Sequence, residues 1–438
     1  MTPWHERLRL PALIALTVSA VALALLVGYA LPQQPLLVVG GVVLMCVATF
    51  ALAQPVLLPL LAMPLIVVVA RFGAGPVDMT ISDWMLGLAF WPALLFAPRP
   101  LSDPMRKLLW LNAIYQSATL FTLVANPYFA NTVEWGHAWL LVSGALLVGW
   151  HVGASGHARL GVRLFLAACL ALALPTIGQA ILQYARGDFG AVYPQWPWPM
   201  HKNFIGNLMA IAAVLVYARP RWAGLSRRWA LPLLLVLLSA LAVSQARQAI
   251  VGLAVGILVV SLRRHGERRR ATFALATAIP MVYIVLTMAR DQIASGNIHN
   301  SWFQRLDWYA DSIRIWREAP LVGHGLRYWT QAEAPAAFQP PNAFLEVMAS
   351  TGVVGLAAFL TLWVGLIVVL LRMNADYGTL ALALALSRLG QAQFDLFWVS
   401  IGVSAPFLLI GVCLGVASEA AERRQSRAGH ESGALVSG

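Results

Sequence analysis

The sequence has little charge. Asp, Glu, Lys and Arg make up 11% of its 438 residues, whereas hydrophobic residues make up 60%. A soluble globular domain carries about 25% charged residues, so this composition argues against one. A bilayer admits only helices or closed barrels, because no water is present there to satisfy the backbone. We therefore expect an all-α fold, a polytopic bundle of membrane helices.

Cysteine is also scarce. The three residues of this type are Cys46, Cys169 and Cys413. All three fall in apolar segments, where a thiol acts as a small hydrophobe, and none has C-x-x-C spacing. We expect no disulfide, no metal site and no cofactor. The sequence also lacks a P-loop, a GxGxxG or HExxH motif and any internal repeat of about 20 to 50 residues.

Acidic residues are the rarer charge, with 18 Asp and Glu against 30 Lys and Arg and a formal net charge of +12. An excess of this kind can indicate nucleic-acid binding. Here, however, the basic residues form short clusters between apolar segments, as the positive-inside rule predicts for a membrane protein. We expect membrane lipid as a partner and no nucleic acid.

Long apolar segments fill the rest of the chain. Fourteen of them approach the length of a spanning helix, about 17 to 25 residues, and we expect 12–14 spans. The weakest are the short pair around Pro55, at 35–53 and 55–70, and the polar segment 380–398. The others cover residues 10–30, 81–97, 108–125, 135–152, 162–184, 203–218, 229–243, 248–262, 271–289, 352–371 and 401–417. The predicted regions are a transmembrane bundle (1–289), a partly helical outer loop (290–341), C-terminal transmembrane helices (342–417) and a disordered tail (418–438).

The basic clusters also predict the orientation in the membrane. If Arg7 and Arg9 are cytoplasmic, most clusters are cytoplasmic, both termini are cytoplasmic and the long polar loop faces outward. Some basic residues then lie on the outer side, where the rule disfavours them, and these are candidates for ligand binding. The alternative is that they snorkel or pair with nearby Asp residues. They are Arg71, Arg186, Lys202, Arg247, Arg290, Arg305, Arg314, Arg317 and Arg327.

Two outer turns carry candidate anion-binding residues. His201, Lys202 and Asn203 begin a predicted helix, where the helix N-terminus and a cation together favour an anion. Arg247 lies in a tight turn between the predicted helices 229–243 and 248–262. An Arg at the start of the second helix can bind phosphate oxygens in a bidentate manner. The alternative for Arg247 is a snorkelling residue that sets the depth of the helix. Trp196 and Trp198, nearby, are typical of interface anchors.

The long loop carries further candidates. Trp302, Leu306, Tyr309, Ile313 and Trp316 fall on one face of a predicted helix that would lie on the membrane surface, with Arg305 on the adjoining face. A glycine-rich turn at 320–325 then holds His324. Where the loop re-enters the membrane, Asn342 is a predicted N-cap. Glu346 is an acid that needs a partner, for which we expect Arg247 or Arg305.

The order of these features resembles a known family. A span ends in Ser-Gln-Ala-Arg at 244–247, the outer loop opens with Arg305 and Trp308, Pro-Leu-x-Gly-x-Gly follows at 320–325, and Asn342 precedes Gly-x-x-Gly at 352–355. Over residues 184–355 this pattern is similar to the O-antigen ligase and O-antigen polymerase superfamily. The resemblance implies a GT-C-like, metal-independent glycosyltransferase of the bacterial inner membrane. Its active site would face the periplasm.

The resemblance also implies substrates and site residues. The donor is a glycan on undecaprenyl diphosphate, and the acceptor is a sugar hydroxyl, lipid A-core in a ligase. The diphosphate leaving group needs positive charge, and sugars favour aromatic faces. We expect catalytic roles for His324, Glu346 and Arg305, and substrate binding by Arg247, Lys202, Asn203, His201, Asn342, Arg71 and Trp308.

One position departs from the family pattern. The ligases normally have a His before the residue equivalent to Asn342, and this sequence has Pro341. Proline cannot accept a proton. His324 is the first candidate for a substitute base and Glu346 the second, with His201 and His299 also near. Alternatively, Pro341 is a replaced residue, or the protein binds lipid-linked glycan without transferring it.

We therefore expect an O-antigen ligase type of transferase. A polymerase of the same superfamily is the first alternative. A flippase or transporter of lipid-linked sugars is the second, for which Arg388 and Asp395 are the candidate charged pair within a span.

Overall fold

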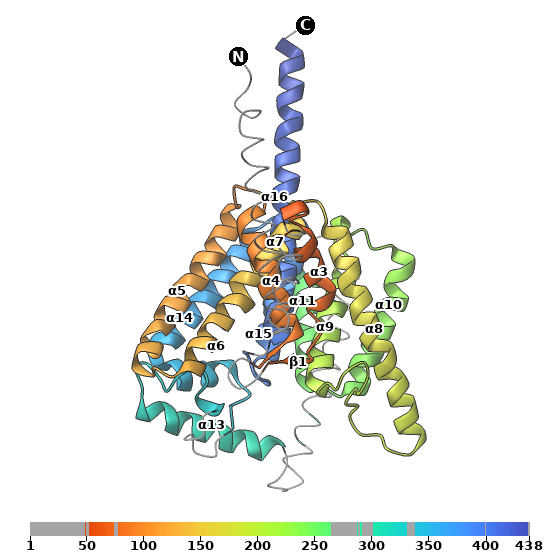
Figure 1. Cartoon of the computed structure of the whole chain (residues 1–438). Helices are drawn as coiled ribbons and strands as arrows, with labels where there is room; N and C mark the ends of the chain where they lie inside the picture. Colours follow the sequence, from red (N-terminus) through yellow and green to blue (C-terminus); the bar gives the residue numbers. More distant parts are fainter. Residues whose placement is uncertain are drawn as a thin grey trace, which may run out of the picture. The chain divides into compact units, whose positions relative to one another are not determined.

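The computed structural model describes residues 49, 52–73, 78–263, 287, 290, 301–330, 338–398 and 400–436 (Figure 1). The predicted spans at 10–30, 35–53 and 271–289 lie almost entirely outside the described residues, as does His299. The chain divides into two units after Leu57. The second unit, Leu58–Gly438, carries everything described below, except that its first helix begins one residue earlier.

The second unit is built from helices. In chain order they are α3 (Leu57–Leu65), α4 (Ile81–Phe96), α5 (Asp103–Ala125), α6 (Phe129–Trp139), the π-helical turn η2 (Leu140–Gly144), α7 (Ala145–Ala154), α8 (Ala158–Ala185), α9 (Lys202–Ala218), η3 (Arg221–Ala223), α10 (Arg227–Ser244), α11 (Arg247–Arg263), α13 (Ser301–Glu318), η4 (Tyr328–Thr330), α14 (Ala343–Arg372), α15 (Ala375–Gln391) and α16 (Ser400–Val436). The strands β1 (Arg71–Phe72) and β2 (Met79–Thr80) pair antiparallel.

These helices confirm the predicted membrane fold. Within the described ranges, six helical segments are long and apolar enough to cross a bilayer: 103–125, 129–154, 158–185, 227–244, 343–372 and 400–426. The apolar helices α4 and α9 are shorter. The protein is a multi-pass helical membrane protein, and the count of 12–14 spans stays a prediction.

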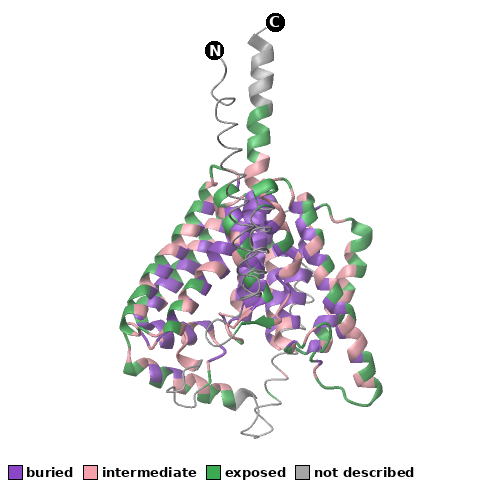
Figure 2. Cartoon of the chain, in the orientation of Figure 1, coloured by how far each residue is buried: buried purple, intermediate pink, exposed green. Residues whose placement is uncertain are grey.

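The core of this unit lies around α16. In the most apolar stretch of α16, 94% of the residues are buried, whereas in that of α10 only 22% are buried. Helix α16 is therefore central and α10 is peripheral (Figure 2). Glycines let α7 and α16 approach closely. A Cβ on Gly149 would lie 1.9 Å from the Leu408 carbonyl oxygen, and one on Gly411 would lie 2.3 Å from the Leu146 carbonyl oxygen. Small residues drive such contacts between membrane helices, where lipid offers no hydrophobic driving force.

Several boundaries differ from the sequence prediction. α14 begins at Ala343, nine residues before the predicted span. α15 ends at Gln391, so residues 392–398 form a connection instead of the end of a span. The tail predicted to be disordered continues α16 as far as Val436. Its residues after Ser418 are mostly good helix formers, and Arg423 pairs with Glu419 one turn earlier at 2.5 Å.

The outer loop contains the predicted surface helix. α13 lies across the ends of α5, α6 and α14 (Figure 1). The helices α9, α11 and α14 begin, and α15 ends, near one another, as the hydrogen bonds described next show.

Candidate functional site

The connection 392–398 contacts residues of three helices. Ala343 N–H donates to the Ala392 carbonyl oxygen at 2.8 Å, which places the start of α14 against the end of α15. The Asn342 side chain donates to Gln393, at 3.3 Å to its amide oxygen. Arg305 of α13 donates to the Phe394 carbonyl oxygen at 3.4 Å. Residues from α13, α14 and α15 therefore surround one short segment.

Asp395 ties the same segment to α9 and α11. Its carboxylate accepts from Asn203 at 3.2 Å and from Asn207 at 3.0 Å. Gln248, the second residue of α11, donates to it at 3.5 Å. Three side-chain amides thus orient one carboxylate at the starts of two helices.

Three cations gather at this place: Lys202, Arg247 and Arg305, which we call the cation cluster. Lys202 and Arg247 are the first residues of α9 and α11. Each of the three is half-buried, and their charges act on one another. Among the described residues, none of them has a carboxylate within salt-bridge distance. Like charges held together without counterions favour an anionic ligand.

The neighbouring polar groups suit the same ligand. His201 caps α9, and its Nδ1 accepts from the Asn203 N–H at 3.2 Å. In the neutral ring Nε2 must then carry the proton, so this nitrogen donates. Desolvation lowers the pKa of His201, although the charge of Asp395 opposes that shift, and Lys202 adds to it. The α9 N-terminus adds its own positive partial charge.

Two buried charges support the connection from within the protein. Arg388 is fully buried and donates to the Leu396 carbonyl oxygen at 2.8 Å and to that of Phe397. Glu346, also buried, accepts from the Phe397 N–H at 3.1 Å and from Gln339 at 2.8 Å. The prediction that Glu346 pairs with Arg247 or Arg305 was therefore wrong. Its oxygens bind the connection and the segment before α14 instead.

The glycine motifs of the loop and of α14 fit against each other. Gly352 interrupts α14 with φ 65°, which frees carbonyl groups of the preceding turn. His324 and Gly325 donate their N–H groups to Ala349 and Ser350 at 3.3 and 2.9 Å. A Cβ on Gly323 would lie 2.3 Å from the Ser350 carbonyl carbon. Only glycine permits this close approach together with a positive φ.

The comparison with known families identifies this region. Residues 232–360 match the family model described as O-antigen ligase. The chain carries an O-antigen ligase domain. The resemblance seen in the sequence is therefore confirmed. A search of curated proteins found no match.

The O-antigen ligase domain contains only part of the site. It begins in α10 and ends in α14, and so contains Arg247, Arg305 and Asn342. Lys202 precedes it and Asp395 follows it. The tertiary structure therefore completes the site of the family domain with residues from α9 and from the connection after α15.

His324, the first candidate base, lies away from the cation cluster. Its Nε2 lies 2.9 Å from the Ile315 carbonyl oxygen, and its ring centre is 4.8 Å from that of Tyr328. Ile315 lies ten residues beyond Arg305, which is about 15 Å along α13. Gly323, the residue before His324, packs against the backbone of α14.

The other predicted residues lie in varied places. Trp308 packs against Phe338, with ring centres 5.3 Å apart. Asn342 caps α14 as predicted, accepting from the Phe344 and Leu345 N–H groups at 3.0 and 3.2 Å. Arg71 is exposed in the β1–β2 hairpin and pairs with Asp78 at 3.0 Å. No contact in the described ranges joins Arg71 to the cation cluster.

Sequence reasoning missed Tyr309 as a polar residue of the site. The sequence indicated only its aromatic face. Burial raises the pKa of its phenol, whereas the charge of Arg305 and a hydrogen bond with Asn342 lower it. Tyr309 therefore stays protonated and can donate a hydrogen bond. Asn207, Gln248 and the role of Asp395 were also missed, because apolar spans surround all three.

A second buried network was missed as well. His137 Nε2 lies 3.1 Å from an Asp83 oxygen, and its Nδ1 lies 3.5 Å from a Glu134 oxygen. The same Glu134 oxygen accepts from Arg327 of the outer loop at 2.7 Å. Ser400, at the start of α16, donates to Asp83 at 2.7 Å. This network attaches the loop to α4, α6 and α16.

Proposed function

We propose that the protein transfers a glycan from a polyprenyl diphosphate carrier to a sugar hydroxyl at the outer face of the bacterial inner membrane. The observation that carries this proposal is the cation cluster, three half-buried cations without a carboxylate partner among the described residues. The O-antigen ligase domain supports the same class of reaction.

The cation cluster suits the leaving group. When the acceptor oxygen bonds to the anomeric carbon, the bond from that carbon to the diphosphate breaks, and its electron pair leaves with the diphosphate. Preorganised cations stabilise that developing charge at no cost of reorganisation. Arg247 and Arg305 can each offer a bidentate fork, and Lys202 a compact charge. His201 adds the Nε2–H donor.

We assign Asp395 as the general base that accepts the proton of the acceptor hydroxyl. It lies at the cation cluster, held by Asn203, Asn207 and Gln248. Glu346 is buried and binds Gln339 and Phe397, whereas Asp395 is partly exposed. The lone pair of His201 is used in the α9 cap. A carboxylate is a recognised general base when it is within hydrogen-bond reach of the proton. This assignment supplies a base in a chain with proline at position 341.

Tyr309 and Asn342 are placed to orient the acceptor sugar. They are linked to each other and lie beside Arg305. A phenol and a side-chain amide can each bond a sugar hydroxyl, and the Tyr ring offers an apolar face. The Gly323–Ser350 contact holds the outer loop, which carries Tyr309, against α14.

Reconstitution of the purified chain tests the proposal. The donor is a labelled glycan on undecaprenyl diphosphate, and two acceptors are offered separately: lipid A-core and a second donor molecule. A product on lipid A-core indicates a ligase, and a lengthened lipid-linked glycan indicates a polymerase. Transfer of the intact donor between leaflets, without a new glycosidic bond, would instead indicate a flippase and refute the proposal.

A further inference from the structure

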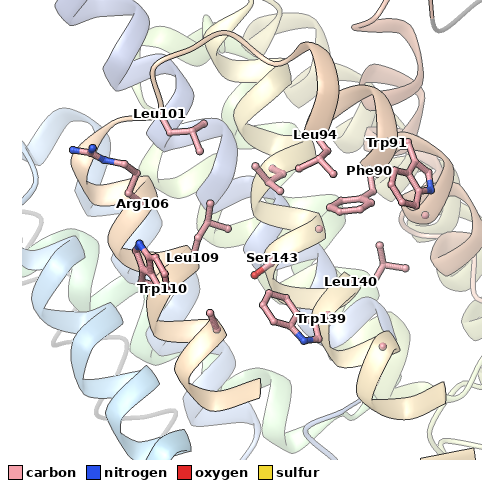
Figure 3. A pocket seen from close by; sticks show the side chains of 15 residues that line it. Phe90, Trp91, Leu94, Leu101, Arg106, Leu109, Trp110, Trp139, Leu140 and Ser143 are labelled. Atoms are coloured by element: carbon pink, nitrogen blue, oxygen red, sulfur yellow. The ribbon is translucent and has the colours of Figure 1, made fainter. Parts of the chain in front are cut away.

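A cavity opens away from the cation cluster. It has a volume of about 650 Å³ and lies between α4, α5 and the helix formed by α6, η2 and α7 (Figure 3). Its floor is the buried set Ser143, Gly144 and Leu147. Apolar side chains form its walls, among them Phe90, Leu94, Leu109 and Trp139. The exposed rings of Trp91 and Trp110 stand at its rim. We call this cavity the α4–α5 groove.

The groove exists because the backbone leaves space there. A Cβ added to Gly136 would meet nothing within 4 Å, and one added to Gly87 would meet only the end of Leu140 at 3.8 Å. The π-helical turn η2, Leu140–Gly144, forms the back of the groove. Such turns are rare and occur frequently at functional sites. The volume is within the range of cavities that hold small-molecule ligands.

One end of the groove is basic. Arg106 is exposed at its rim and lies 3.8 Å from Asp103, a weak pair. Lys107 pairs with the same Asp103 at 2.6 Å, and Arg99 donates to the Leu94 carbonyl oxygen at 2.8 Å, so this segment carries three cations and one acid. Anionic lipid headgroups are attracted to clusters of this kind at a membrane surface.

The basic end lies on the membrane face opposite the cation cluster. α5 and α14 run antiparallel, because Leu111 meets Gly365 and Tyr115 meets Phe359 at 5.6 Å between rings. Arg106 is therefore near the end of α14, whereas Asn342 precedes its start. By the predicted topology the Arg106 side is cytoplasmic.

We propose that the α4–α5 groove binds one acyl chain of an anionic phospholipid of the cytoplasmic leaflet, with the lipid phosphate at Arg106. The lining is almost wholly apolar, which suits a hydrocarbon chain, and the charge at the mouth favours an anionic headgroup. A donor prenyl chain would start at the cation cluster, on the other face. The lipid would hold α4 against α5, and α4 carries Asp83 of the buried network.

Native mass spectrometry of the purified full-length chain tests this site. The probes are palmitoyl-oleoyl-phosphatidylglycerol and the phosphatidylcholine with the same chains. Gly136→Leu fills the groove and should abolish retention of phosphatidylglycerol. Gly178→Leu is the matched control, because Gly178 lies on α8 and a Cβ there also meets nothing within 4 Å. Gly87→Leu is the second variant if Gly136→Leu does not fold.

The role of Arg106 in binding the lipid headgroup is tested separately. Arg106→Gln should weaken the preference for phosphatidylglycerol over phosphatidylcholine about fivefold, the effect of one basic residue near an anionic surface. Equal retention of the two lipids by the unaltered chain would overturn the proposal. So would equal phosphatidylglycerol retention in Gly136→Leu and Gly178→Leu, or displacement of the lipid by undecaprenyl phosphate.

A photo-reactive residue at Leu140 distinguishes a lipid from the chain itself. Cross-links to phosphatidylglycerol support the proposal, and cross-links to the chain's own residues before Leu57 overturn it.

Discussion

Two charged regions lie near the outer loop, and they differ in how their charges are satisfied. In the buried network, Glu134 pairs with Arg327, and His137 lies between the carboxylates of Asp83 and Glu134. In the cation cluster the three positive side chains have no such partner among the described residues. A buried charge that is fully paired attaches structural parts to one another, whereas cations held without counterions are preorganised for a ligand.

The two regions should respond differently to mutation. Changes in the cation cluster and at Asp395 should alter turnover and leave the fold intact. Changes in the buried network should alter stability first, because they leave a charge buried without its partner.

The largest expected effect is at the proposed base. Asp395→Asn keeps the shape of the side chain and removes its ability to accept a proton, so turnover should fall by about 10²- to 10⁴-fold. Initial rates of glycan transfer in proteoliposomes measure this, with thermal unfolding as the check on structure. Turnover close to that of the unaltered chain would remove Asp395 from the mechanism.

Loss of an arginine from the cation cluster should lower turnover somewhat less than Asp395→Asn does. Arg247→Ala and Arg305→Ala should each remove about 2 to 4 kcal/mol of transition-state stabilisation, as the loss of one preorganised donor does. Arg→Lys should rescue activity only in part, since the ammonium lacks the bidentate fork. Arg317→Ala is the matched control, because Arg317 is exposed on α13. Equal losses in Arg305→Ala and Arg317→Ala would contradict the assignment.

A substitution in the buried network should lower the stability of the protein. Glu134→Gln leaves His137 and Arg327 without their shared carboxylate, which should cost about 2 to 3 kcal/mol, less than for a fully buried pair because Arg327 is partly exposed. The thermal midpoint of the purified protein should fall, and turnover per folded molecule should change little. A large loss of turnover at unchanged stability would erase the distinction between the two regions.

The smallest expected effect concerns position 341. Pro341 is buried directly before the α14 cap. If Asp395 is the base, Pro341→His should change turnover by less than about tenfold, because a second base adds little. His324→Ala should also leave turnover within about tenfold, since His324 contacts the far part of α13. A gain of about 10²-fold or more in Pro341→His would show that no substitute base operates.

Much of the fold followed from local sequence. Apolar runs predicted α4, α8, α9, α10 and α11 closely, because a membrane helix needs only a long apolar segment and satisfies its own backbone. The Asn342 cap was also predicted, since a cap depends on neighbouring residues alone. The end of α15 was not, because residues 392–398 are apolar enough to resemble the end of a span.

For the site, the sequence selected some residues and gave no account of their arrangement. Arg247, Arg305 and Lys202 stood out because each opposes the orientation rule. Their gathering in one place, and the convergence on Asp395 of Asn203, 192 residues earlier in the chain, depend on helix packing. The sequence shows glycines at 323 and 352, but only the structure shows that they bring the backbones of the loop and of α14 into contact.

The sequence by itself determined the class of this protein, its helices and its family domain, because hydrophobicity and short motifs are properties of neighbouring residues. Only the tertiary structure decided that Asp395 is bound by Asn203 and Gln248, the neighbours of Lys202 and Arg247, that His324 lies away from these cations and that Glu346 holds the connection after α15. Contacts between distant segments depend on close packing of helices, which no local pattern of residues specifies.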